Sequence, residues 1–171
     1  MISRLLSIAV MLLSCAAGTG AAQGARPASS RSAAARDVAS ARAVYTEVEQ
    51  AIAAKRLVPR DTTLACDGAP FDVSVTRYAD VSGRIRMLSV GAGSDDQSQT
   101  TRYYYDAGGR LRFAIATRGA VNGTREDERA WYSPSGGVVR RVSQTTAGLG
   151  YPFGEIRAIP NARGWEIDVC R

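Results

Sequence analysis

A ten-residue motif that occurs twice in this chain, followed by a degenerate third copy, constrains the fold more than any other feature. The close copies, 78–87 and 104–113, share a tyrosine, an aspartate, a glycine and an Arg-x-Arg pair, and the third copy covers 132–140. Asp80 and Asp106 lie 26 residues apart, about the length of one hairpin with its connection. Each copy has Asp or Ser to cap a turn and Gly where the backbone needs positive φ. The motif therefore predicts a repeated strand–turn–strand unit.

Alternation of apolar and polar residues supports antiparallel strands around these turns. Val73 and Val75 alternate with polar residues, and Ile85 and Met87 alternate with arginines. This pattern is typical of half-buried antiparallel strands. Asn122-Gly123 predicts a type I′ hairpin turn. Strands are expected around Phe71-Val73-Val75, Ile85-Met87, Leu111-Phe113-Ile115, 98–106, 125–133, 137–144 and 164–170, the last with Trp165, Ile167 and Val169 inward.

An amphipathic helix is expected before the strands. Apolar residues recur at spacings of three and four from Val38 to Ile52, which lays one stripe along a helix over about 37–56. Residues 23–36 lack large apolar side chains and predict a flexible linker. The fold class is thus α+β, an N-terminal helix packed on an antiparallel β-meander of six to seven strands in one domain, 37–171. At fold level this resembles cystatin-like folds, which brings no function with it.

The repeat also has a likeness among known proteins. Tyr-x-Asp-x-x-Gly-Arg-x-Arg is similar to the tyrosine–aspartate repeats of bacterial cell-surface shell proteins, over about ten residues per copy. The likeness covers hairpin chemistry, and it assigns the chain to no family.

The absence of histidine excludes many enzyme mechanisms. Among 171 residues there is no imidazole, so Ser-His-Asp and Cys-His nucleophile pairs and His-ligated metals are ruled out. The glycines form neither a Walker loop nor a dinucleotide-binding motif. Asp95-Asp96 lacks the ligand spacing of a calcium loop and is interpreted as a turn. We therefore expect no catalytic residues, no metal and no cofactor.

The N-terminus predicts export. A basic start at Arg4, a short apolar run and then small residues are typical of a secretory signal peptide over 1–22, cleaved after Ala22. The run is too short for a membrane span, which takes about 20 residues. In a second interpretation, Leu12-Leu13-Ser14-Cys15 resembles the lipobox of bacterial lipoproteins, with lipidation of Cys15. The chain is then periplasmic or secreted, or anchored to a membrane by its lipid.

Export makes a disulfide the simplest role for the other two cysteines. Cys66 and Cys170 bracket nearly the whole predicted sheet, and a pair of cysteines in an exported chain usually forms one bridge. Removal of 1–22 leaves 21 basic and 16 acidic side chains, a net charge of +5. This charge permits an anionic envelope component as partner, while another exported protein remains an alternative. No nucleic acid is expected.

Two groups of residues are candidates for ligand binding. The first is the set Arg84, Arg86, Arg110 and Arg112, predicted on the outer sheet face at matching strand ends, with Tyr103, Tyr104 and Tyr105 on the strand between. Arginine with tyrosine can hold an anionic or sugar-containing ligand. The alternative is a solvated face, in which these arginines pair with carboxylates across strands.

The second group is the aromatic loop 147–154. Tyr151 and Phe153 there suit a binding loop, or a segment that folds back and caps the core. Taken together, these patterns predict an exported, non-catalytic envelope domain that binds a partner. One alternative is a periplasmic inhibitor or immunity protein against a secreted enzyme. The other is a carboxylate-based hydrolase, for which the candidate acids are Glu126, Glu128, Glu155, Glu166 and Asp168.

Overall fold

The computed structural model describes residues 28–67 and 71–170, and it begins with the long helix α1 (Ala28–Ala53). Ala41 and Val48 of the predicted stripe are fully buried, which confirms the amphipathic helix. The helix begins nine residues earlier than predicted, because its alanine-rich first turns have a high helix propensity. The linker prediction is therefore wrong for 28–36, and 23–27 lie outside the described residues. Lys55, with φ of 56°, and a hydrogen bond from the Arg56 amide to the Ala51 carbonyl end the helix in a Schellman motif.

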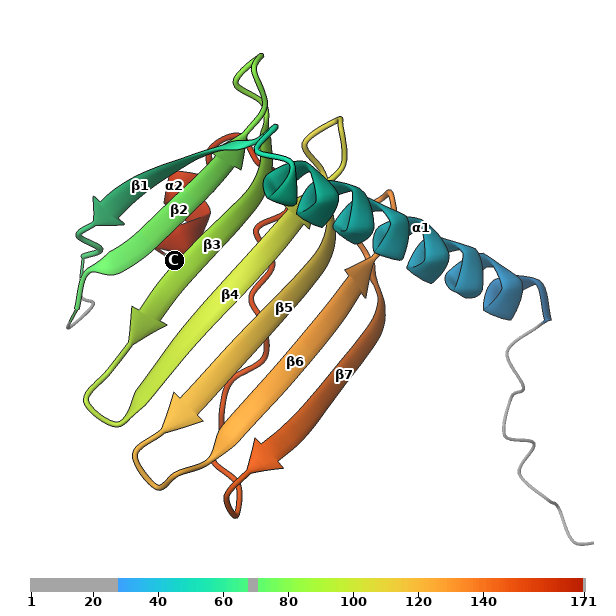
Figure 1. Cartoon of the computed structure of the whole chain (residues 1–171). Coiled ribbons are helices and arrows are strands. Elements are labelled where there is room, and N and C mark those ends of the chain that lie inside the picture. Colours follow the sequence, from blue (N-terminus) through green and yellow to red (C-terminus); the bar gives the residue numbers. More distant parts are fainter. Residues whose placement is uncertain (1–27, 68–70, 171) are drawn as a thin grey trace, which may run out of the picture.

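Seven strands follow and form one antiparallel sheet, as Figure 1 shows. Their spatial order is their order in the chain, so the predicted α+β meander is confirmed. The first strand was not predicted, because its sequence, VPRDTTL, has no clear alternation and includes a proline. The strands are β1 (Val58–Leu64), β2 (Val73–Ala79), β3 (Ile85–Gly93), β4 (Gln97–Tyr105), β5 (Leu111–Ala120), β6 (Arg125–Tyr132) and β7 (Val138–Ala147).

Both faces of the sheet are covered, which gives the domain three layers (Figure 1). On the helix face, α1 packs against β4–β7 over Tyr104, Phe113 and Trp131. On the opposite face, which we call the arm face, the C-terminal arm (residues 148–170) packs Ile156 and Trp165 onto the sheet. The central strands are thus buried on both sides, whereas their alternation predicted one solvated face.

The three copies of the sequence repeat form three hairpins. Each hairpin has the same kind of turn and the same kind of bulge. In each turn the capping side chain accepts a backbone N–H, as when Asp106 Oδ1 accepts from Arg110 at 3.1 Å, and a glycine follows with φ between 77° and 90°. Each returning strand then has a register shift, so that one residue bulges out of the ladder: Arg86, Arg112 and Val139. The bulge switches the face on which the next side chain lies.

Because of these bulges, the predicted alternation of faces is wrong at the start of β3 and of β5. Leu111 packs on the arm face, whereas Phe113 and Ile115 pack on the helix face, although all three were predicted on one face. Ile85 and Met87 differ in the same way.

The β5–β6 hairpin forms at Asn122-Gly123 as predicted, but its turn type differs. The Gly123 amide donates to the Ala120 carbonyl at 2.9 Å, and the Ala120 amide donates to the Thr124 carbonyl. Among the described non-glycine residues, only Lys55 has positive φ, so Asn122 has an ordinary backbone conformation. This is a type I turn followed by a left-handed Gly123, not the predicted type I′ turn.

The C-terminus is a short helix, α2 (Trp165–Val169), and not the predicted last strand. Trp165 is buried and Val169 packs on the same core, whereas Ile167 between them is exposed, which is the spacing of a helical turn. The predicted Cys66–Cys170 disulfide is present, with Cα atoms 5.1 Å apart. It joins the end of the arm to the chain just after β1.

Candidate functional site

The structure divides the predicted arginine–tyrosine face into two groups. Arg84 and Arg110 lie in the β2–β3 and β4–β5 turns, with about 60% of each side chain exposed. Their Nε atoms lie 2.9 Å and 3.4 Å from the carboxylates of Asp80 and Asp106 in the same turns. These two arginines remain accessible from solvent.

Arg86, Arg112 and Tyr104 of that predicted face lie beneath or beside α1, whereas Tyr103 and Tyr105 pack on the arm face. Arg86 donates to Glu47 of α1 at 2.9 Å, and Arg112 donates to Ser40 at 3.2 Å. Tyr104 is fully buried, and its hydroxyl donates to Glu49 at 2.6 Å. Burial is the largest cause that raises the pKa of Tyr104, followed by this hydrogen bond. These three side chains fasten the helix to the sheet, so they are not available to a ligand.

The aromatic loop folds back onto the sheet, which is the capping alternative. The Tyr151 hydroxyl donates to Asp96 at 2.5 Å in the β3–β4 turn, and its ring centroid lies 4.7 Å from that of Phe153. Hydrogen bonds from Ser94 and then Tyr151 hold the pKa of Asp96 below its usual value. The Arg118 guanidinium in turn lies over the Phe153 ring, with its Cζ atom 5.9 Å from the ring centroid. Both aromatic candidates therefore have partners within the fold.

Two of the candidate hydrolytic carboxylates belong to a buried ionic cluster under the arm. Arg118 Nη1 lies 2.8 Å from carboxylate oxygens of both Glu126 and Glu128. Glu128 also accepts the Ile156 amide at 3.0 Å and lies 3.3 Å from Arg141. With its side chain only 3% exposed, Glu128 joins β6 to the arm. Both carboxylates have cationic partners within the fold.

The remaining candidate acids are scattered. Glu155 lies on the arm and pairs with Arg141, and Glu166 and Asp168 lie on α2.

Two adjacent cavities lie at the end of the sheet that carries the repeated turns. One cavity of about 620 Å³ lies between the β2–β3 turn, the β4–β5 turn and arm residues 161–163. A second, of about 460 Å³, lies between β1, β2 and the β2–β3 turn. Gly83 and Ile85 line both cavities, so the two cavities adjoin, and we call them together the arginine groove.

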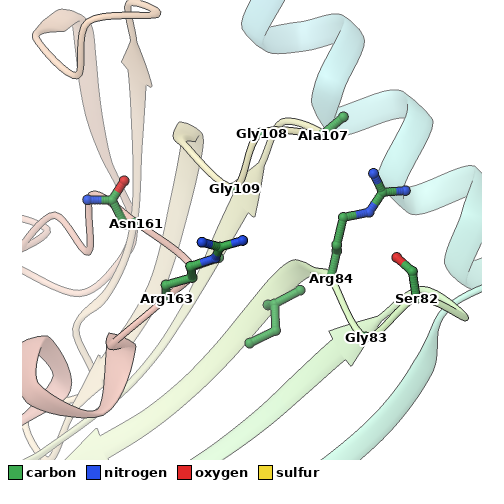
Figure 2. Close-up of a pocket in the computed structure, with 10 residues that line it drawn as sticks. Ser82, Gly83, Arg84, Ala107, Gly108, Gly109, Asn161 and Arg163 are labelled. Carbon is green, nitrogen blue, oxygen red and sulfur yellow. The ribbon is translucent and has the colours of Figure 1, made fainter.

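Four arginines line the arginine groove: Arg60, Arg77, Arg84 and Arg163. Arg84 and Arg163 stand on opposite sides of the larger cavity, as Figure 2 shows. Arg60 and Arg77 are directly opposite each other on β1 and β2, a pairing of like charges that destabilises a sheet unless an anion compensates it.

Asp80 is the only carboxylate among the lining residues, and it is already engaged. Hydrogen bonds, the largest from Ser82, hold the pKa of Asp80 far below its usual value, so it stays ionised next to Arg84. Within the described chain, Arg60, Arg77 and Arg163 have no ion pair. The groove therefore has an excess of three positive charges, and planar guanidinium groups suit phosphate or carboxylate oxygens.

Of these four residues, only Arg84 was predicted as a ligand-binding residue. Arg60 was not predicted because strand β1 was not predicted. Arg163 lies in the groove only because the arm crosses the arm face of the sheet. The available signal was the repeat, which placed Gly83 and Gly109 in turns that line the larger cavity.

Comparison with protein-family models, with curated proteins and with solved structures gave no match. In the part of the chain that the structure describes, neither helix has the length and apolar character that a membrane span requires. Across residues 28–67 and 71–170, no group of three Cys, Asp or Glu side chains is placed to hold a metal ion.

Proposed function

We propose that this chain is an exported, non-catalytic binding module, and that it holds an anionic component of the cell envelope in the arginine groove. The observation that supports this is the charge of the groove, where four arginines face one carboxylate that is already paired. The ligand chemistry is two or more phosphate or carboxylate groups on one molecule. A lipid headgroup surface and a soluble anionic glycan both supply such groups.

The shape of the groove favours a ligand with spaced charges. Its walls come from the exposed turns of two hairpins and from the arm, so the backbone of Gly83 and Gly109 can approach a ligand closely. Val58 and Val81 at its rim are strongly exposed, which suits contact with apolar parts of the same ligand. Export is proposed from the N-terminal sequence, which lies outside the described residues.

Substitution of the three unpaired arginines tests the proposal. The triple variant Arg60→Ala, Arg77→Ala, Arg163→Ala leaves Arg84 in place, because that residue also holds its own turn. At about 1 kcal/mol per basic residue near an anionic surface, the triple variant should bind about a hundredfold more weakly. The control is Arg56→Ala, Arg102→Ala, Arg125→Ala, which removes the same charge from exposed positions outside the groove.

The measurement uses three probes at low salt. They are vesicles of phosphatidylcholine with phosphatidylglycerol, soluble polyphosphate and polygalacturonate, which separate a lipid surface from free phosphate and from carboxylate. Binding of the wild type to at least one probe, lost in the groove variant and kept in the control variant, supports the proposal. Equal losses in both variants, or no binding of the wild type to any probe, overturn it.

A further inference from the structure

The last strand of the sheet has an open edge. Within the described residues, β7 pairs with β6 alone, and Figure 1 shows no other strand on its outer side. Its sequence, VVRRVSQTTA, has no proline, glycine or lysine and is rich in β-branched residues, which favour strands. β1 at the other edge contains Pro59, which has no backbone N–H to offer to another strand. The two edges of the sheet are therefore protected unequally.

The charged side chains of β7 do not guard this edge, because both turn back onto the protein. The Arg140 guanidinium lies over the ring of Trp131 on β6, 5.3 Å from its centroid. Arg141 reaches Glu128 on β6 and Glu155 on the arm. Natural sheets commonly protect an edge with charges that face solvent, bulges or prolines. In this sheet the charges are engaged, and the two bulges of β7, at Val139 and Thr146, lie near its ends and leave a regular ladder over 140–145.

We propose that β7 pairs antiparallel with β7 of a second copy of this chain, so that two sheets join into one. In an antiparallel pair, residues that lie directly opposite each other project their side chains on the same face of the sheet. The twofold axis must therefore pass between one residue and its own copy, and not between two successive residues. An axis at Arg141 or Arg140 places like charges opposite each other, which is unfavourable. An axis at Val142 places Arg141 opposite Ser143 and Arg140 opposite Gln144. An axis at Ser143 also avoids paired arginines and gives the same overlap, but only the axis at Val142 places two apolar side chains opposite each other.

The projecting part of α1 fits this arrangement. The helix packs on the sheet from Val38 onward, and the ten residues before it extend about 15 Å at 1.5 Å per residue. That length equals about three strand spacings. Figure 1 shows this part of α1 passing beyond β7, near the end of the sheet that carries the repeated turns.

The twofold axis carries the projecting turns of each helix onto a bare part of its partner. The axis exchanges the two ends of β7 and keeps both helices on one side of the joined sheet. Each projecting segment then lies over the half of the partner's helix face that has no helix of its own. That half carries Thr117, Asp127 and Gln144, which lie opposite one another on β5, β6 and β7. The part of α1 that extends beyond the sheet of one copy thus covers the sheet of the other.

Sedimentation equilibrium of the purified chain and cysteine cross-linking test this proposal. Val142→Cys places two thiols at the axis, where directly opposite Cβ atoms are about 5 Å apart, close enough for a disulfide. Gln144→Cys is the control on the same face of the same strand. In this register it faces Arg140, and its own copies lie about 13 Å apart along the strands.

We expect a wild-type mass of twice the chain and oxidative cross-linking of Val142→Cys but not of Gln144→Cys. A monomer at concentrations up to about 100 µM overturns the proposal. Cross-linking of Gln144→Cys instead of Val142→Cys, or of both equally, overturns the register centred on Val142. The result is independent of the arginine groove, which lies at the opposite edge of the sheet.

Discussion

The buried carboxylate of Glu128 should control the stability of the arm, and Glu128→Leu tests this directly. The substitution keeps a side chain of similar size but removes the anion that faces Arg118 at 2.8 Å. It also leaves the buried Ile156 amide without its acceptor. Arg118 is 1% exposed, so water does not replace the lost partner, although Glu126 remains beside it.

The expected cost follows from that environment. Removal of one partner from a buried ion pair costs about 3–5 kcal/mol, and Glu128→Leu belongs in this range. Glu128→Gln keeps an acceptor for Ile156 and should cost about half as much. Total stabilities of small domains are about 5–15 kcal/mol, so the loss is a large part of the whole.

Equilibrium urea unfolding, followed by tryptophan fluorescence, measures both costs. Trp131 lies on the helix face and Trp165 on the arm face, so the two tryptophans of the chain report on both layers. The control is Asp127→Leu, at the position just before Glu128 on β6. The Asp127 side chain is half-exposed on the helix face and lies 3.9 Å from Arg129 in an ion pair. This substitution should cost less than about 1 kcal/mol. A loss below about 1 kcal/mol for Glu128→Leu, or equal losses in the two variants, would refute this reasoning.

Three further predictions concern the disulfide, the tyrosines and one glycine. Cys66→Ser with Cys170→Ser opens a loop whose ends are 104 residues apart, and chain entropy predicts a loss of about 4.7 kcal/mol in urea unfolding. Burial is the largest cause that raises the pKa of Tyr103 to about 12, from about 10 in the unfolded chain. The free energy of unfolding should therefore stay constant below pH 10 and fall as the pH rises towards 12, because the unfolded chain loses this proton first. Urea unfolding at successive pH values measures this fall. Gly148→Ala should lower the melting temperature, because φ is 79° there and a Cβ would lie 2.6 Å from the backbone of the β5–β6 hairpin. Gly154→Ala, where a Cβ meets no atom within 4 Å, should leave the melting temperature nearly unchanged.

The hairpins could be predicted from the sequence because their determinants are local. Asp80 and Asp106 accept N–H groups within four residues of themselves, and the glycines that follow supply the positive φ. Turn chemistry of this kind appears in any one copy, and the repeat makes it more evident. The cysteine pairing was also predictable, because two cysteines outside the predicted signal peptide leave one combination.

The faces of the strands could not be predicted, because they depend on bulges and on layers that lie far away in sequence. A bulge at Arg112 leaves no mark in an Arg-x-Arg pattern, yet it turns that arginine towards α1. Tyr103, Tyr104 and Tyr105 are all buried because α1 covers one face and the arm covers the other. The arm lies about 50 residues further along the chain than β4, and its partners there are set by tertiary packing alone.

The strict meander implies an order in which the parts of the molecule come together. Each strand pairs with its neighbour in the chain, so the sheet can grow one hairpin at a time through short loop closures. The arm is different, because its hydroxyl contacts from Tyr103 and Tyr105 each span 54 residues and need a sheet on which to dock. We expect the arm to dock last and the two thiols to meet only then. Since Asn161 and Arg163 belong to the arm, one wall of the arginine groove is absent until folding is complete. An incompletely folded chain would therefore lack the proposed anion site.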